Sequence, residues 1–330
     1  MLEVVEAGVL TSIQDAGRPD WTHLGVPVGG ACDPWSLAVA NLLVGNDAGA
    51  AAVEMTLVGG TFAVRTPVTV GLAGADMGGV VRESGRPLAT GRTHLLEQGW
   101  TIAFPGVTDS TARSGARAYL AMPGGVDVPS VLGSASTALG AGFGGIDGRR
   151  LQAGDVVRAR EPKALPGHEA AWPALDDDPL AAADSNPIRV LPGPASGLAA
   201  ILRSEWTVGA ASDRVGLRLE GPPPLPAASS GEMLSHGVVR GAIQLPPGGG
   251  PIVLLADHQT TGGYPIAAVV ITADHPRLGQ LRPGSKVRFT ATTIDDARLA
   301  LVHQKEALAR GGATIRAGAT WDELWQSAGG

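Results

Sequence analysis

Short apolar runs alternate with glycine-rich turns over much of the first half of the chain. Between residues 52 and 159 such runs include 69–72, 101–104 and 118–122. Each is too short for an ordinary helix and is bounded by turn residues. Strands of this length and spacing are typical of β-barrels and β-sandwiches, so the pattern predicts a mainly β fold.

The segment 251–265, PIVLLADHQTTGGYP, combines an apolar run with a polar cluster. Residues 252–256 predict a buried strand, and the glycine pair at 262 and 263 predicts a hairpin turn, because glycine accepts positive φ there. Five polar residues follow the strand: Asp257, His258, Gln259, Thr260 and Thr261. Polar groups presented at a strand end are a candidate ligand site. The alternative is that Asp257 and the threonines only cap the turn.

The first predicted helix begins at Asp33 and Pro34. Asp33 suits the N-cap, Pro34 the first helical residue, and Gly45 the stop after the last turn. Asn41 lies on or near the buried face of this helix, where we favour a buried amide bonded to backbone over a functional role. The sequence also predicts a short helix at 198–203.

Two further helices are predicted at the C-terminal end. One runs from Asp295 or Asp296 to Arg310 and is ended by Gly311 and Gly312. The other is short and begins at the capping-box pattern 320–323.

A weak internal repeat indicates a duplicated β unit. Residues 96–104 resemble 281–289, because in both a turn glycine (Gly99, Gly284) leads into a strand that ends in phenylalanine. The turn at Gly154 has the same form. The segment 161–187 is rich in Pro, Ala and acidic residues and is typical of a linker. The sequence thus predicts a first β-barrel domain over 1–160, a linker over 161–187, and a second β-barrel domain with C-terminal helices over 188–330.

Composition narrows the function classes. The 330 residues are 44% hydrophobic but only 4% aromatic, and the net charge is −6. Few aromatic residues and no basic run argue against nucleic acid as a partner. We expect a soluble cytoplasmic protein without a membrane segment, since there is no signal-peptide pattern and no apolar run approaches the ~20 residues that span a bilayer.

The sequence does not support a common cofactor-binding or metal-binding motif. Residues 140–145 match GxGxxG, but neither a helix nor a βαβ unit follows, so turn glycines are the better interpretation. The chain has no P-loop and no HExxH motif, and its histidines are scattered, so no metal site is predicted. Cys32 is the only cysteine, which excludes an intrachain disulfide, and packing is a more ordinary role for it than nucleophilic catalysis.

Two further polar loops are candidates for anion binding. Gln14, Asp15 and Arg18 lie within five residues of each other, and Asp213 precedes Arg214 at another turn. The planar guanidinium group of arginine suits carboxylates and phosphates because it donates two parallel hydrogen bonds. The alternative for each loop is an Asp–Arg pair that only holds the loop. Gln244 is expected near the same barrel end.

Together these segments resemble one family. The motifs are TSIQDAGRP (11–19), GACDPWSLAVANLLVGND (30–47), GGVDVPSVLGSAST (124–137), SDRVGLRLEG (212–221), GAIQLPPGGGPIVLLADHQTTGGYP (241–265) and QLRPGSKVRF (280–289). They are similar to the family named allophanate hydrolase subunit 2, KipA, 5-oxoprolinase C subunit and biotin-dependent carboxyltransferase. The resemblance covers roughly residues 3–300. It implies two cyclophilin-like β-barrel units with a few short helices.

The resemblance also implies partners and a reaction. Such chains pair with the KipI-like B subunit of 5-oxoprolinase and with its A subunit, and hydrolyse 5-oxo-L-proline to L-glutamate with ATP held by the complex. One alternative is a biotin-dependent carboxyltransferase component acting on a urea-like amide, and another is a KipA-like regulator of a KipI-type kinase inhibitor. The chain carries no biotin-attachment, biotin carboxylase or amidase signature, so by itself it is neither a urea carboxylase nor an allophanate hydrolase.

Residue roles follow from the chemistry of a lactam acid. A cation is needed for the substrate carboxylate, an acceptor for the ring N–H, and donors for the developing oxyanion. The predicted catalytic residues are Asp15, Asp257, Gln244, Thr260 and Thr261. The predicted substrate-binding residues are Gln14, Arg18, Asp213, Arg214, His258, Gln259, Gly262, Gly263 and Tyr264.

Overall fold

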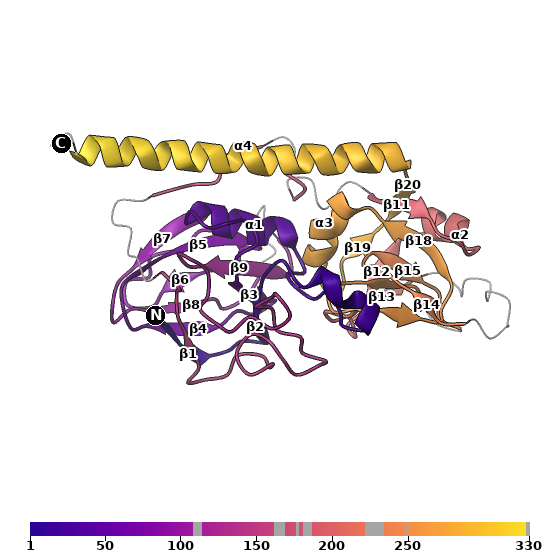
Figure 1. The fold of residues 1–330 in the computed structure, drawn as a ribbon, viewed down its shortest axis with the longest axis horizontal. Helices are drawn as coiled ribbons and strands as arrows, with labels where there is room; N and C mark the ends of the chain where they lie inside the picture. Colours follow the sequence, from indigo (N-terminus) through magenta and orange to yellow (C-terminus); the bar gives the residue numbers. More distant parts are fainter. Residues whose placement is uncertain are drawn as a thin grey trace.

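Two β units lie side by side, and one long helix lies across both (Figure 1). The computed structural model describes residues 1–107, 114–161, 169–175, 178–180, 187–221, 234–247 and 250–327. The helices are η1 Pro19–Leu24, α1 Pro34–Leu43, α2 Leu198–Arg203, η2 Thr272–Asp274, α3 His275–Gln280 and α4 Ile294–Ser327. The mainly β prediction is confirmed, but α4 has 34 residues, so the helices are not all short.

The first unit contains two five-stranded antiparallel sheets. Their strands are β1 Leu2–Glu6, β2 Leu10–Gln14, β3 Ala52–Thr56, β4 Thr61–Val64, β5 Val68–Gly74, β6 Val80–Val81, β7 Arg92–Leu96, β8 Thr101–Ala103, β9 Arg117–Ala121 and β10 Val156–Val157. The orders are β10-β1-β4-β8-β6 and β2-β3-β9-β5-β7. Both sheets contribute to one apolar core, which includes Phe62, Met55 and Leu120.

The second unit is built on one eight-stranded sheet, with an additional two-stranded ribbon. Its strands are β11 Ile188–Pro192, β12 Trp206–Val208, β13 Gly216–Glu220, β14 His236–Gly237, β15 Ala242–Gln244, β16 Ile252–Leu254, β17 Thr261–Gly262, β18 Ile266–Val270, β19 Lys286–Val287 and β20 Phe289–Ala291. The sheet order is β19-β12-β13-β16-β15-β18-β11-β20, and β14 pairs with β17. A separate core fills this unit, with Trp206, Ile243 and Phe289 among its members.

The predicted hairpin around the glycine pair at 262 and 263 is wrong. β15 lies between β16 and β18, so the two predicted strands are not neighbours. Thr261 and Gly262 instead pair with Gly237 and His236 of β14. Gly262 has no positive φ and packs beside Gln244, so close approach is the reason for glycine there.

The predicted repeated turn is confirmed. Gly99, Gly154 and Gly284 have φ of 89°, 92° and 88°, which glycine adopts without strain. Their backbone N–H groups donate to the carbonyl oxygens of Val64, Val4 and Val208, at 2.9, 2.8 and 2.8 Å. Each of these hydrogen bonds thereby ties the turn to the strand that will pair with the strand following the turn.

The first helix forms as predicted. Asp33 caps α1 by accepting a hydrogen bond from the Ser36 backbone N–H at 2.9 Å, and Pro34 is its first residue. Asn41 is fully buried and donates to the Ala50 carbonyl at 2.8 Å, which confirms the structural role favoured for it. Helix α2 is also confirmed.

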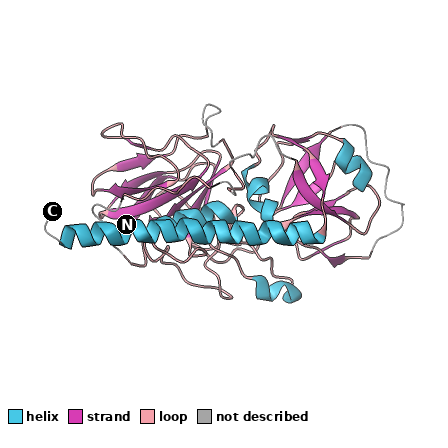
Figure 2. Cartoon of the chain, turned by 90° about the horizontal axis from the view of Figure 1, so that it is seen from above, coloured by secondary structure: helices cyan, strands magenta, loops and turns pink. Residues whose placement is uncertain are grey.

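The predicted stop at the glycine pair 311–312 is wrong, because α4 continues through both residues. A side chain at residue 311 would overlap the ring of Trp172, and one at 312 would lie 3.3 Å from Leu42. Trp172 is itself buried edge-on against Trp35, with ring centroids 6.3 Å apart. The glycines therefore let α4 approach the first unit closely. In the view from above, α4 runs lengthwise over both units (Figure 2).

Replacing Gly311 by alanine is expected to lower the free energy of unfolding by about 1–3 kcal/mol, because the added methyl group overlaps the Trp172 ring. Gly318 on the same helix has open space around it. Gly318→Ala is the matched control and should stabilise the protein by about 0.5–1 kcal/mol through helix propensity. Denaturant unfolding measures both, and equal shifts of the same sign would contradict this packing.

The predicted linker is partly attached to the first unit. The Thr93 backbone N–H donates to the Ala170 carbonyl at 2.9 Å, and that of Trp172 donates to the Gly91 carbonyl at 2.8 Å. Residues 162–168, 176–177 and 181–186 of this segment lie outside the described residues, so the domain boundaries stay a prediction. Within the described part of the chain, no helix has both the length and the apolar character that a bilayer crossing needs.

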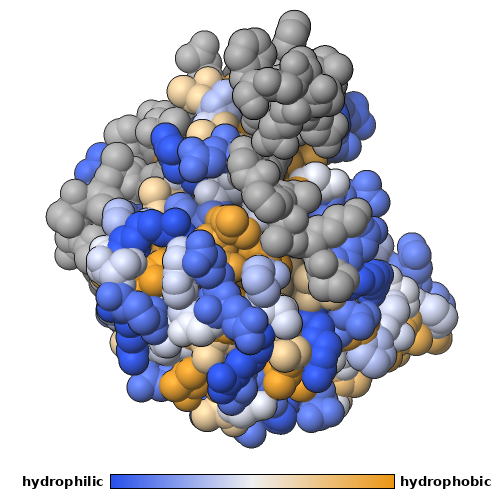
Figure 3. All heavy atoms as spheres, turned by 90° about the vertical axis from the view of Figure 1, so that its left-hand side faces the viewer, coloured by the Kyte–Doolittle hydropathy of each residue, from blue (hydrophilic) through white to orange (hydrophobic). Residues whose placement is uncertain are grey.

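The outer end of the first unit has a mixed surface (Figure 3). In the visible part, apolar residues form separate patches between polar and charged ones. Scattered apolar residues of this kind are ordinary on a solvent-exposed surface. This surface therefore gives no indication of a functional site. The polar residues between the two units are considered next.

Candidate functional site

The side chain of Arg214 joins the two units. It precedes β13 in the second unit and donates to Glu54 on β3 of the first unit. Its Nε and Nη2 donate to the two carboxylate oxygens of Asp257 at 2.8 and 2.9 Å, and Nη2 also donates to the Gly30 carbonyl at 2.7 Å. Arg214 is only 3% exposed and all three of its nitrogens are used. It is therefore a buried structural cation whose partners are already present.

Glu54 is the centre of this buried ionic cluster. The hydroxyl of Tyr119 and the backbone N–H of Cys32 donate to its Oε2 at 2.7 and 2.9 Å. Arg117 Nε lies 3.9 Å from its Oε1. Burial raises the pKa of Glu54, but Arg214 and Arg117 outweigh burial and hold it below its usual range. Glu54 is therefore the anion that compensates two buried arginines.

Asp15 anchors its own loop. Its Oδ1 accepts from the Gly17 backbone N–H at 2.8 Å and from the Ser134 hydroxyl at 2.6 Å. Its Oδ2 accepts from the Ala135 backbone N–H at 2.6 Å. These bonds bring the loop after β2 against the segment at 134–136. Asp15 thus holds its loop through these donors and not through the Asp–Arg pair that was the alternative.

Arg18, by contrast, has a nitrogen without a partner. It is 1% exposed, its Nη2 donates to the Ser136 carbonyl at 2.5 Å, and its guanidinium carbon lies 4.9 Å from the centre of the Phe143 ring. Its Nη1 is buried and has no hydrogen-bond partner among the residues that the structure describes. A buried guanidinium N–H without an acceptor is unfavourable, so this group is suited to a ligand that accepts a hydrogen bond from it.

Arg18 and Asp257 approach each other across Gly29. A Cβ placed on Gly29 would lie 3.3 Å from Arg18 Nη1 and 3.9 Å from Asp257 Oδ1. The loop of Arg18 in the first unit and the loop of Asp257 in the second therefore converge, as predicted. Burial lowers the pKa of Arg18, while Asp15 and Asp257 act in the opposite direction.

Two glutamines form a second group near Gly262. Gln259 Nε2 lies 3.5 Å from Gln244 Oε1, at the limit of a hydrogen bond. Gln244 is 1% exposed, and within the described part of the chain its Nε2 has no hydrogen-bond partner. Gln14 donates to the Ser12 hydroxyl at 2.9 Å and to the Thr137 carbonyl at 3.3 Å. No described residue donates to its Oε1.

The remaining predicted residues differ in their surroundings. His258 is buried, its Nδ1 lies 2.6 Å from the Gln259 carbonyl, and burial lowers its pKa. Asp213 is exposed and accepts from the backbone N–H groups of Val215 and Gly216, so it holds its own loop. Thr260 is half-buried, and Thr261, Gly263 and Tyr264 are exposed. The structure does not join these exposed residues to Arg18 or Asp257 by a side-chain hydrogen bond within the described ranges.

Sequence reasoning missed most of the buried cluster. Glu54, Arg117 and Tyr119 were not predicted, nor was Gln280, which donates to Asp33 at 2.6 Å and so joins α3 to the cap of α1. The available signal was the single acid in the buried run 52–56. Ser134 and Ser136 lie in a motif that carried the resemblance but had no role assigned to them.

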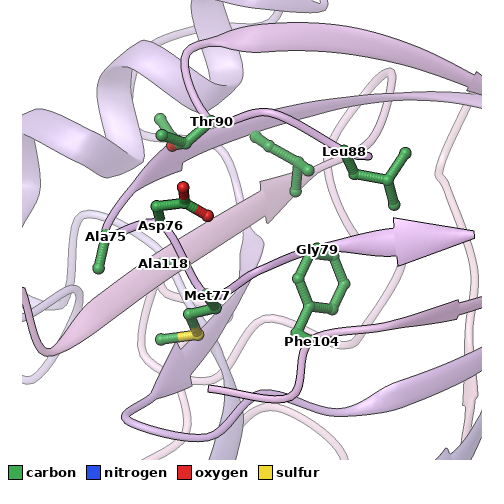
Figure 4. A pocket seen from close by; sticks show the side chains of 10 residues that line it. Ala75, Asp76, Met77, Gly79, Leu88, Thr90, Phe104 and Ala118 are labelled. Atoms are coloured by element: carbon green, nitrogen blue, oxygen red, sulfur yellow. The ribbon is translucent and has the colours of Figure 1, made fainter. Parts of the chain in front are cut away.

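A small pocket lies elsewhere, in the first unit (Figure 4). Asp76 and Thr90 lie on one side of it, and Met77 and Phe104 on the other. Its two polar side chains are already bonded to backbone, Asp76 to the Gly78 N–H and Thr90 to the Gly74 carbonyl. It contains no residue predicted for the site, so we assign the site to the polar groups between the units. In the described ranges, no three His, Cys, Asp or Glu side chains are grouped as a metal site.

Known proteins resemble the chain over nearly its whole length. It is 37% identical to the 5-oxoprolinase C subunit of Escherichia coli (strain K12), over 90% of this chain and 93% of that protein. It is 31% identical to urea amidolyase of Lachancea kluyveri, again over 90% of this chain but only 17% of the relative. The solved urea carboxylase of Kluyveromyces lactis superposes with a TM-score of 0.80 at 29% identity, over 93% of this chain and 29% of that chain.

The family comparison agrees with these relatives. Residues 24–291 match the family described as carboxyltransferase domain, subdomain A and B. This span includes all strands of the second β unit and the first unit from residue 24 onward, but not β1, β2 or the loop of Arg18. The resemblance inferred from the sequence motifs is thereby confirmed. The chain belongs to the family of carboxyltransferase domains with subdomains A and B.

Proposed function

We propose that this chain is the C subunit of an ATP-dependent 5-oxoprolinase, which hydrolyses 5-oxo-L-proline to L-glutamate together with the A and B subunits. The observation that carries the proposal is the extent of the match with the Escherichia coli protein, of which 93% is covered. The match with urea amidolyase covers only 17% of a much longer chain. The Escherichia coli protein is therefore a relative of similar length, whereas urea amidolyase is much longer.

The free polar groups suit a lactam that carries a carboxylate. Arg214 has no nitrogen left for a ligand, so Arg18 is the better cation for the substrate carboxylate. Asp15 already accepts three hydrogen bonds, so Asp257 is the better acceptor for the ring N–H. Arg18 and Arg214 were both predicted to bind the substrate, and Asp15 and Asp257 were both predicted to be catalytic. Their remaining hydrogen-bonding capacity favours Arg18 and Asp257.

The lactam carbonyl needs donors as it develops negative charge. Gln244 Nε2 is buried and unpaired, which makes it the strongest donor candidate. Gln259 lies beside it, and Thr260, Thr261 and the backbone N–H groups of 262 and 263 follow in the same segment. Donors held in place before the reaction stabilise an oxyanion without reorganising.

ATP held by the complex would supply a phosphoryl group that activates the lactam carbonyl, because amide resonance otherwise makes hydrolysis slow. The sequence has no P-loop, and residues 140–145 form turns with Gly142, Gly144 and Gly145 at positive φ. No phosphoryl-transfer step is therefore assigned to residues of this chain. Its own residues bind the substrate, orient the ring and stabilise charge on the carbonyl oxygen.

The test is reconstitution. The chain, purified with its A and B partner subunits, is expected to release glutamate from 5-oxo-L-proline only when ATP is present. The mixture without this chain is the control and should release none. No turnover with all three subunits and ATP would remove the proposal.

A second candidate function is a biotin-dependent carboxyltransferase acting on a urea-like amide. The family description and the likeness to urea carboxylase favour it. Transfer from carboxybiotin to urea, abolished by avidin, would support this candidate. Activity that resists avidin would exclude it. Binding of a KipI-type partner without any turnover would instead favour a regulatory role.

A further inference from the structure

The carboxylate of Asp257 is held at both of its oxygens. Arg214 Nε donates to Oδ2 at 2.8 Å and Nη2 donates to Oδ1 at 2.9 Å, the paired geometry that a planar guanidinium group makes with a carboxylate. The backbone adds a third bond, because the Asp257 N–H donates to the Arg214 carbonyl at 2.9 Å. The carboxylate therefore cannot rotate about its last side-chain bond without breaking a hydrogen bond.

Arg214 is itself fixed from the other unit. It donates to Glu54 on β3, and its Nη2 donates to the Gly30 carbonyl at 2.7 Å. Glu54 is held in turn by the hydroxyl of Tyr119 on β9, at 2.7 Å. Two strands of the first unit thus determine the orientation of Asp257 in the second unit.

Burial decreases along this series of contacts. The side chains of Glu54 and Arg214 are 1% and 3% exposed, whereas that of Asp257 is 12% exposed. Gln259, two residues further on, is exposed. An ionised carboxylate has about four lone-pair sites, so Asp257 can accept further hydrogen bonds in addition to the two from Arg214. Of the three side chains, Asp257 is therefore the one that solvent reaches most.

We propose that Arg214 is a positioning residue, which orients the Asp257 carboxylate toward the substrate N–H and is itself oriented by Glu54. This inference rests on the proposed function, in which Asp257 accepts from the ring N–H of 5-oxo-L-proline. Arg214 acts through Asp257 and not on the substrate, because its three nitrogens already donate to acceptors of the protein. An acceptor that is held in place before binding loses no rotational freedom when the substrate arrives.

Arg214→Lys is the first test. Lysine keeps a positive charge beside Glu54 but lacks the planar pair of donors that holds both Asp257 oxygens. We expect the KM for 5-oxo-L-proline to rise roughly 3- to 30-fold in the assembled complex, since a misaligned acceptor loses part of a charged hydrogen bond. Loss of folded protein alone would lower kcat and leave KM unchanged.

Arg189→Lys is the matched control. Arg189 lies in the same unit and also donates to both oxygens of an aspartate, Asp274, at 3.2 and 2.6 Å. Asp274 is 1% exposed and has no role at the site, so the KM of this variant should stay within about twofold of the native value. An equal rise of KM in the two variants would overturn the positioning role.

A double-mutant cycle shows whether Arg214 acts through Asp257. Asp257→Asn removes the charged acceptor, so adding Arg214→Lys should raise KM little further, whereas independent residues would give multiplied effects and contradict the proposal. If Arg214→Lys does not fold, Tyr119→Phe replaces it, because it removes one donor to Glu54 and leaves Arg214 in place. The expected rise of KM is then about 2- to 5-fold, and an unchanged KM would refute the proposal.

A crystal structure of the Arg214→Lys protein separates this inference from the proposed function. We expect the Asp257 carboxylate to be turned from its native orientation. A carboxylate in the native orientation would refute the positioning role even if the native complex releases glutamate. A turned carboxylate, together with a native complex that releases no glutamate, would support the positioning role and refute the proposed function.

Discussion

Replacing Glu54 by glutamine is expected to lower the free energy of unfolding by about 3–5 kcal/mol, because it removes the anion beside buried Arg117 and one of the two carboxylates that pair with buried Arg214. Glu54 accepts from Arg214, Tyr119 and the Cys32 backbone N–H. The glutamine amide group donates where the carboxylate accepted, so one of these donors also loses its acceptor. Denaturant unfolding of both proteins measures the difference.

The control is Glu3→Gln, which breaks an exposed pair with Arg65 and should change stability little. The pH dependence gives a second readout. The pKa of Glu54 lies below its ordinary value of 4.5, so its contribution is present above pH 4.5 and is lost as the pH falls through the lower folded-state pKa. Glu54→Gln should therefore flatten the acid limb of the stability curve. Equal losses for Glu3→Gln and Glu54→Gln would contradict the central role of Glu54.

Replacing Arg18 by alanine is expected to cost about 3–4 kcal/mol of substrate binding, on the order of 10²- to 10³-fold in kcat/KM of the reconstituted complex. The reason is that Arg18 is a buried cation whose Nη1 has no hydrogen-bond partner among the described residues and can donate to the substrate carboxylate. Arg18→Lys should recover part of the loss, because lysine keeps the charge but not the planar pair of donors.

Arg86 offers a matched control for this experiment. It also lies over an aromatic ring, 4.7 Å from the centre of Trp100, and donates to a backbone carbonyl, but it is exposed. Arg86→Ala should leave kcat/KM within about twofold, since surface substitutions away from a site have small effects. A comparable loss of kcat/KM in the two variants would show that the Arg18 effect is not specific to the substrate.

Local chemistry in the sequence was enough for elements that depend on their own residues. The cap at Asp33, the amide of Asn41 and the turns at Gly99 and Gly284 were predicted because their signals lie within a few residues. The glycine pairs at 262–263 and 311–312 were misinterpreted. Their role depends on Gln244 and on Trp172, which the chain brings close only after folding.

The site shows the same limit. Loops containing Arg18, Arg214 and Asp257 were singled out because acids and arginines cluster there in sequence, and these loops do converge. What the sequence did not reveal is which of their groups are already occupied. Arg214 and Asp15 are satisfied by Glu54 and Ser134, which lie far away in the chain. Hydrogen-bond capacity is a property of the folded neighbourhood, and neither composition nor spacing reports it.

The packing of α4 has a consequence for biosynthesis. The helix is made last, yet it covers Trp172 and Leu42, which belong to parts of the chain made much earlier. While the ribosome is still adding the second unit, that apolar surface has no native cover. Nascent chains that stall or end before Ile294 would expose it permanently, so we expect such fragments to aggregate or to be held by chaperones.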